Sequence, residues 1–135
     1  MAPRGLRNNN PGNIRNSQRT EWQGEVDARD KKDDSFEEFI DMEHGYRALI
    51  KLLQNYRRRH GCRTIADFIN RWAPTNENDT SAYIKSVCYK LDVPSSYQPD
   101  VDDCDTMCAL AAAISEHENG VKADMNCIRR AWAIL

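Results

Sequence analysis

The most informative stretch of the sequence is CDTMCALAAAISEHENG, residues 104–120. Its apolar side chains recur at steps of three and four residues, which is the spacing of one face of an α-helix. These side chains are Cys104, Met107, Cys108, Ala111 and Ile114. The pair Asn119-Gly120 is a strong helix stop. We therefore predict a helix from about Asp103 to His117 with one buried face.

One further step of four residues along this face reaches Glu118. Around the helix axis Glu118 lies about 40° from Ile114, whereas Glu116 lies about 160° away, on the solvent side. In the last turn a carboxylate meets the negative end of the helix dipole, and partial burial also disfavours its charged form. Both effects favour the protonated acid that a general acid needs. The alternative is a frayed terminal glutamate in solvent. Glu43, which follows an apolar helical face, is a second candidate carboxylate.

Composition predicts one globular domain over residues 1–135. The chain has 19 Lys+Arg, 21 Asp+Glu and 40% hydrophobic residues, and at this length it buries a core without metals or disulfides. A net charge of −2 disfavours nucleic acid as the main partner, because phosphate binding needs a cationic surplus. We find no run of about 20 apolar residues and no apolar run behind the N-terminal cations. The sequence thus predicts synthesis in the cytoplasm without a signal peptide, and action elsewhere only after delivery.

The five cysteines predict reduced, mostly buried thiols. Their odd number and uneven spacing differ from a secreted disulfide framework, and no histidine stands at zinc-ligand spacing to Cys104 and Cys108. The sequence also lacks a glycine-rich phosphate loop and a G-x-S-x-G motif. We therefore expect no metal and no cofactor.

Helical periodicity predicts the fold class α+β, mainly helical. Helices are expected from residue 45 to about His60, from Thr64 to Pro74, from about Thr80 to Pro94, from Asp103 to His117, and from about Ala123 to the end. The polar first third predicts loops and a short, irregular β-ribbon over residues 13–29. Ser35 is expected to open a short helix with Phe36, Phe39 and Ile40 on one face.

Several blocks of the sequence resemble a family of small phage-related, lysozyme-like proteins. These blocks are RGLRNNNPGNIR (4–15), WQG (22–24), Asp33 with Phe36 and Phe39, GYRA (45–48), INRWAP (69–74), NEN (76–78) with Thr80 and Tyr83, and ENG (118–120). A looser similarity connects ENG with the catalytic helix end of flagellar-type glucosaminidases and lytic transglycosylases. In those proteins the Asn-rich segment follows that helix, whereas here it precedes it. The resemblance therefore implies a circularly permuted lysozyme-like domain.

The resemblance implies cleavage of the β-1,4 bond between N-acetylmuramic acid and N-acetylglucosamine in peptidoglycan. Glu118 would protonate the glycosidic oxygen and later activate a water or the muramic 6-hydroxyl. Asp33 is the preferred second carboxylate and Glu43 the reserve, while a single-glutamate mechanism is also common in this superfamily. Asn119 stands where the superfamily often has serine.

The remaining site candidates fall into two groups, by the part of the substrate or site that they would contact. Asn9, Asn10 and Asn13 could bind acetamido groups or orient Glu118, and Trp22, Thr80, Tyr83 and Asn119 could line sugar subsites. Their alternatives are turn formation, core packing and helix capping.

Two other function classes stay open. One is a catalytically inactive virion or cell-wall-binding module of the same fold, and the other is a nucleic-acid-associated protein built around Arg57, Arg58 and Arg59. For the enzyme, the expected partners are glycan strands together with phage virion or secretion-machine components, and the expected state is a monomer.

Overall fold

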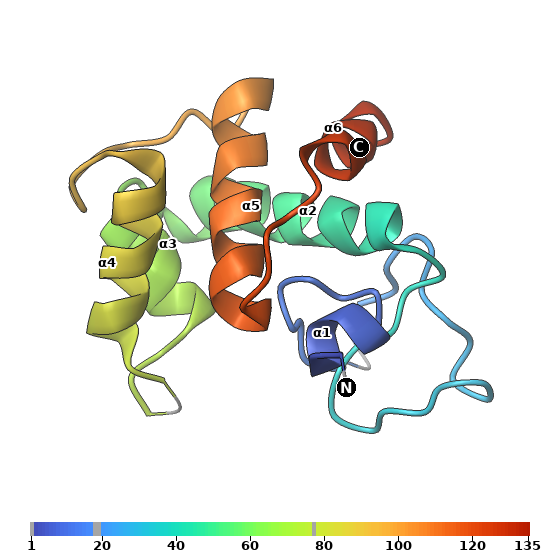
Figure 1. Ribbon diagram of the computed structural model, residues 1–135. Helices are drawn as coiled ribbons and strands as arrows, with labels where there is room; N and C mark the ends of the chain where they lie inside the picture. The colour runs from blue at the N-terminus through green and yellow to red at the C-terminus, as the bar shows by residue number, and fades with distance from the viewer. Residues whose placement is uncertain (1, 18–19, 77) are drawn as a thin grey trace.

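The computed structural model describes residues 2–17, 20–76 and 78–135 and is mainly helical (Figure 1). Its helices are α1 (Arg4–Arg7), α2 (Met42–His60), α3 (Ile65–Trp72), α4 (Thr80–Leu91), α5 (Cys104–Asn119) and α6 (Met125–Ala133). The five helices expected from periodicity are present, and α2 begins a few residues earlier than expected. In the part of the chain that is described, no helix has both the length and the apolar character needed to cross a membrane.

Helix α5 is the centre of the core. It crosses α2 and lies between α4 and α6 (Figure 1). Met107, Leu110 and Ile114 are completely buried, and the small side chains of Ala111 and Ala113 are also buried, which lets neighbouring helices approach closely. The predicted apolar face is therefore confirmed, and burial extends around most of the helix.

Short polar side chains cap the N-termini of the longer helices. Each accepts a hydrogen bond from a backbone N–H in the first turn, which satisfies a group that has no partner within the helix. These caps are Asp41 for α2, Thr64 for α3, Asp79 for α4, Asp103 for α5 and Asp124 for α6. The helices α2 and α5 end at Gly61 and Gly120, which have φ angles of 68° and 69°. Both stops are as predicted.

Residues 2–17 and 20–41 form an irregular layer beside α2 and the end of α5 (Figure 1). Asn10 organises this layer, because its buried amide bonds the backbone of Ile14 twice and the carbonyl of Glu37 once, at 2.9–3.0 Å. Gly45 lets the layer contact α2, since a β-carbon there would overlap the carbonyl of Asn9. Ile14 and Phe39 of the layer also form a small apolar cluster with Ala48 of α2.

Two expectations for this layer differ from the structure. The segment after Ser35 is extended and not helical, because its backbone bonds to neighbouring loops: Glu37 N–H to Ile14 and Phe39 N–H to Asn8, both at 2.9 Å. In place of the β-ribbon expected over residues 13–29, the described residues contain isolated antiparallel bridges, Arg15 with Phe36 and Glu25 with Phe39. Residues 18 and 19 of the expected ribbon lie outside the described residues.

Candidate active site

Glu118 occupies the last turn of α5, half-buried, and both of its carboxylate oxygens accept a hydrogen bond. Asn13 Nδ2 donates to Oε1 at 2.7 Å, and the Tyr83 hydroxyl donates to Oε2 at 2.7 Å. These donors come from the N-terminal layer and from α4. Glu116, on another side of α5, is also half-buried, with Lys90 Nζ at 3.4 Å from its carboxylate. The sequence assigned Glu116 to solvent, and this part of the expectation is wrong.

Tyr83 is held rigidly against Glu118. Its side chain is buried, and its ring stacks on His117 with 3.8 Å between the ring centroids. Burial, together with the neighbouring Glu118 charge, raises the pKa of Tyr83 well above its ordinary value. Tyr83 therefore keeps its proton and serves as a hydrogen-bond donor. Because a hydroxyl also accepts, it can bond to a protonated Glu118 as well.

Asn13 is fixed by tight packing between the N-terminal layer and α5. Its φ angle is 51°, in the left-handed region that asparagine tolerates. Asn119 Nδ2 donates to the carbonyls of Pro11 and Ser115, both at 2.9 Å. Gly5 leaves the space for this junction, because a β-carbon there would overlap Asn119 Oδ1 and stand 3.0 Å from Asn13 Oδ1. The Asn13 amide donates through Nδ2 to Glu118, while its Oδ1 is buried without a hydrogen-bond partner among the described residues.

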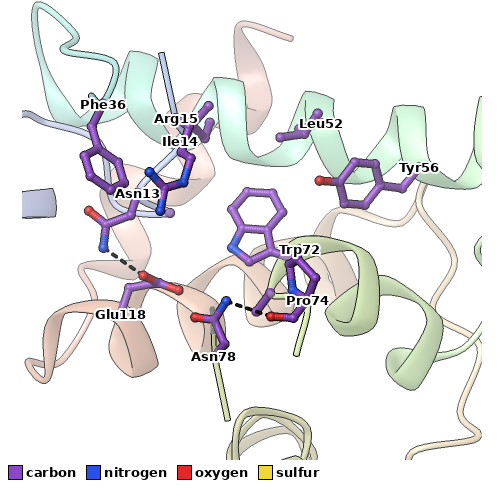
Figure 2. A pocket seen from close by; sticks show the side chains of 12 residues that line it. Asn13, Ile14, Arg15, Phe36, Leu52, Tyr56, Trp72, Pro74, Asn78 and Glu118 are labelled. Carbon is purple, nitrogen blue, oxygen red and sulfur yellow. Dashed lines mark hydrogen bonds between the residues drawn. The ribbon is translucent and has the colours of Figure 1, made fainter. Parts of the chain in front are cut away.

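A cavity of about 380 Å³ opens beside Glu118 and Asn13 (Figure 2). Its aromatic lining consists of Phe36, Tyr56 and Trp72, and Arg15 lies over the Phe36 ring at 5.0 Å. Among its lining residues, all within the described part of the chain, Glu118 is the acidic one. Aromatic faces beside a carboxylate and an amide suit a sugar, which stacks through C–H groups and hydrogen-bonds at its edges.

A second cavity of about 260 Å³ adjoins the first, and both are lined by Asn78 and Glu118. It also contains Asp79, Tyr83 and His117. Asn78 Nδ2 donates to the Pro74 carbonyl at 3.2 Å, which is visible in Figure 2. Glu118 thus lies where two hollows meet.

Asp33, the preferred second carboxylate, is engaged elsewhere. Arg4 binds it with two hydrogen bonds of 2.6 and 2.8 Å, and Asn8 Nδ2 donates at 3.0 Å. These bonds, that from Arg4 foremost, hold the pKa of Asp33 well below its ordinary value. Asp33 lines a separate hollow with Arg7 and Asn8, and it is not part of the lining of either cavity at Glu118. Its position indicates a structural ion pair.

Glu43, the reserve candidate, lies in the first turn of α2. Arg130 of α6 donates to its carboxylate at 2.5 Å. This contact fastens α6 to α2, and Glu43 is not part of the lining of either cavity at Glu118.

The other candidate residues hold the backbone around the site. Asn9 Nδ2 donates to the Phe39 carbonyl at 3.1 Å, Thr80 Oγ1 donates to the Ala73 carbonyl at 2.5 Å, and half-buried Trp22 packs on the Ile14 cluster. Asn10 and Asn119 are buried with the bonds given above. Of the predicted site residues, the structure brings Asn13 and Tyr83 to Glu118. Glu77 of the NEN motif lies outside the described residues.

Sequence reasoning missed several residues that line the cavities. These are Phe36, Tyr56, Asn78, Asp79 and His117. Tyr56 has the spacing of a core residue and Asp79 that of a helix cap, so their place in the cavity lining leaves no local signal. Trp72 is a candidate for sugar stacking from sequence, but its spacing favours core packing, and the structure places it in the lining. No group of three or more potential metal ligands occurs in the described parts of the chain. The five cysteines are free thiols there, and Cys62, Cys108 and Cys127 are buried, as expected.

Comparison with known proteins connects the chain to a phage. It is 40% identical over 121 residues to Protein P5 of Pseudoalteromonas phage PM2, and the match covers 88% of this chain and 72% of the phage protein. The chain therefore belongs to the same family as this phage protein. The name of that protein states no activity, and no protein-family model matches the chain.

Proposed function

We propose that the protein is a peptidoglycan-cleaving glycosidase with a lysozyme-like, circularly permuted fold. The observation that carries the proposal is the position of Glu118, at the junction of two cavities, with both oxygens held by side chains from other parts of the fold. The substrate would be the β-1,4 bond between N-acetylmuramic acid and N-acetylglucosamine. A phage relative is consistent with delivery to the cell wall by lysis, by a virion or by a secretion device.

Glu118 would act as the general acid. It would give a proton to the glycosidic oxygen, which departs as a hydroxyl while the anomeric carbon develops oxocarbenium character, and Glu118 would remain as a carboxylate. Tyr83 can serve both states of Glu118, because its hydroxyl donates to the carboxylate and accepts from the acid. The amide of Asn13 would fix the direction of the acid toward the bond.

The aromatic cavity would bind the sugars. Phe36, Tyr56 and Trp72 line it, and aromatic rings of this kind stack on pyranose rings. Arginines already lie over two of these rings, Arg4 and Arg15 over Phe36 and Arg71 over Tyr56. Trp72 is therefore the ring best placed for a sugar. Peptidoglycan carries carboxylates on its lactyl and peptide groups, which suit the positive charge of these arginines. Acetamido groups would find hydrogen-bonding partners in Asn78 and in the backbone near Asn13.

Clearance of purified peptidoglycan tests the proposal. We expect the wild-type protein to lower the turbidity of a peptidoglycan suspension and Glu118→Gln to lower the rate by 10²-fold or more. Glu116→Gln is the matched control, because Glu116 lies on the same helix and pairs with Lys90 outside both cavities. Binding without clearance by the wild-type protein would favour the inactive cell-wall-binding module instead.

A further inference from the structure

Asp79 is the other carboxylate in the space around Glu118. It lines the smaller cavity together with Glu118, Tyr83 and His117. Among the described residues that line the two adjoining cavities, these are the acidic ones. Asp79 and Glu118 therefore line the same cavity of about 260 Å³, which is large enough to hold water.

The start of α4 fixes the position of Asp79. Its Oδ1 caps the helix by accepting from Ala82 N–H at 3.1 Å, and its carbonyl accepts from Tyr83 N–H at 3.0 Å. Residues four apart lie on the same face of a helix. Asp79 therefore lies on the face of α4 from which Tyr83 reaches Glu118, one turn nearer the start of the helix.

Asp79 differs from the other acidic side chains near the site in having no cationic partner. Arg4 binds Asp33, Arg130 binds Glu43, and Lys90 faces Glu116. For Asp79, which is exposed, the described residues provide the one capping bond to Oδ1 and no ion pair, so Oδ2 has no hydrogen-bond partner among them. A carboxylate that is held at one oxygen and open at the other is suited to accept a proton from water.

We propose that Asp79 is the general base of a hydrolytic reaction, an inference that rests on the glycosidase function proposed above. A water molecule in the smaller cavity attacks the anomeric carbon, and a new C–O bond forms. Asp79 takes one proton from that water, the glycosidic C–O bond breaks, and Glu118 gives its proton to the departing oxygen. The new end is a reducing muramic acid, heavier by one water than the anhydro product of a transglycosylase.

Asp79→Asn separates this role from helix capping, because asparagine caps a helix about as well as aspartate. We expect a 10²-fold or greater fall in kcat, an unchanged KM and nearly unchanged thermal stability. The matched control is Asp103→Asn, which makes the same change at the cap of α5, where Oδ2 accepts from Thr106 N–H at 2.9 Å. Asp103→Asn should keep wild-type kcat.

Chemical rescue and product analysis complete the experiment. Asp79→Ser keeps a capping oxygen and leaves space, so added sodium azide should restore turnover and yield a glycosyl azide. Wild-type products should be reducing by mass spectrometry. Equal kcat for Asp79→Asn and Asp103→Asn, or anhydro products from the wild type, would overturn the role of Asp79 and leave the glycosidase function standing. The wild-type protein is assayed first. If it does not clear peptidoglycan, both the glycosidase function and the role of Asp79 are overturned.

Discussion

Residues 42–135 and the described residues of 2–41 are stabilised by different kinds of interaction. The first region buries continuous apolar faces around α5, including Leu110, Ile114 and Ile128. The second has a small apolar cluster, and polar side chains bonded to backbone, above all Asn10, fix its course. The candidate site lies where the two regions meet, with Asn13 from one and Glu118 from the other. A cleft in this fold therefore depends on both kinds of stabilisation.

Truncation of a core residue in the helical region should have the largest effect on stability. Ile114 is completely buried in α5, so Ile114→Ala removes apolar contacts and leaves a cavity. We expect the free energy of unfolding to fall by about 2–5 kcal/mol in urea denaturation. Ile40→Ala is the control, because Ile40 is 62% exposed and should change it by less than about 1 kcal/mol. Equal effects would contradict the position of the core.

Removal of the Asn10 amide should weaken the N-terminal layer by a smaller amount. Asn10→Ala leaves two carbonyls and one N–H buried without this partner, and we expect a loss of about 2–3 kcal/mol. Hydrogen exchange should speed up more at the amides of Ile14 and Glu37 than in α5. Asn16→Ala, at an exposed position of the same layer, is the control. Uniform acceleration across both regions would contradict their separate stabilisation.

The stability of the N-terminal layer should also depend on pH. Glu37 is completely buried with Lys31 Nζ at 3.5 Å, and burial, assisted by the neighbouring Glu25 carboxyl, raises the pKa of Glu37 from 4.5 to about 7. Between these values the unfolded chain has released the proton that the folded chain keeps. Stability from this group is therefore complete below about pH 4.5 and decreases as the pH rises toward 7.

Denaturation in urea between pH 4 and 8 measures this dependence, with Glu37→Gln as the comparison. In the wild type, the free energy of unfolding should decrease between pH 4.5 and 7, and in Glu37→Gln this decrease should be smaller. Glu21→Gln, at an exposed position, should keep the wild-type profile. An identical slope for wild type and Glu37→Gln would show that other groups cause the dependence.

The two regions also differ in how far the sequence predicts them. Helical periodicity, the Thr64 cap and the Gly120 stop predict α2 to α6, because core packing repeats with the period of the helix. Phe36 and Phe39 misled the same reasoning. Their spacing of three fits a helix, but the segment forms its backbone bonds with distant loops, and such bonds leave no periodic signal.

The candidate site also has a part that local spacing predicts and a part that depends on contacts between distant residues. The position of Glu118 in the last turn of α5 follows from the spacing of the apolar side chains before it. Asn13 and Tyr83 were proposed from resemblance, and only the folded chain brings them to Glu118. Asp33 and Glu43 could not be excluded from sequence, because the arginines that bind them are 29 and 87 residues away.

The hydrogen bond between Asn13 and Glu118 joins residues 105 positions apart in the chain. Closing so long a loop costs conformational entropy, which the contacts between the N-terminal layer and the helices must offset. During synthesis, Asn13 leaves the ribosome long before α5 exists. Any nascent chain that contains Glu118 already contains Asn13 and Tyr83, so Glu118 lacks the amide of Asn13 only as long as the N-terminal layer has not docked on α5.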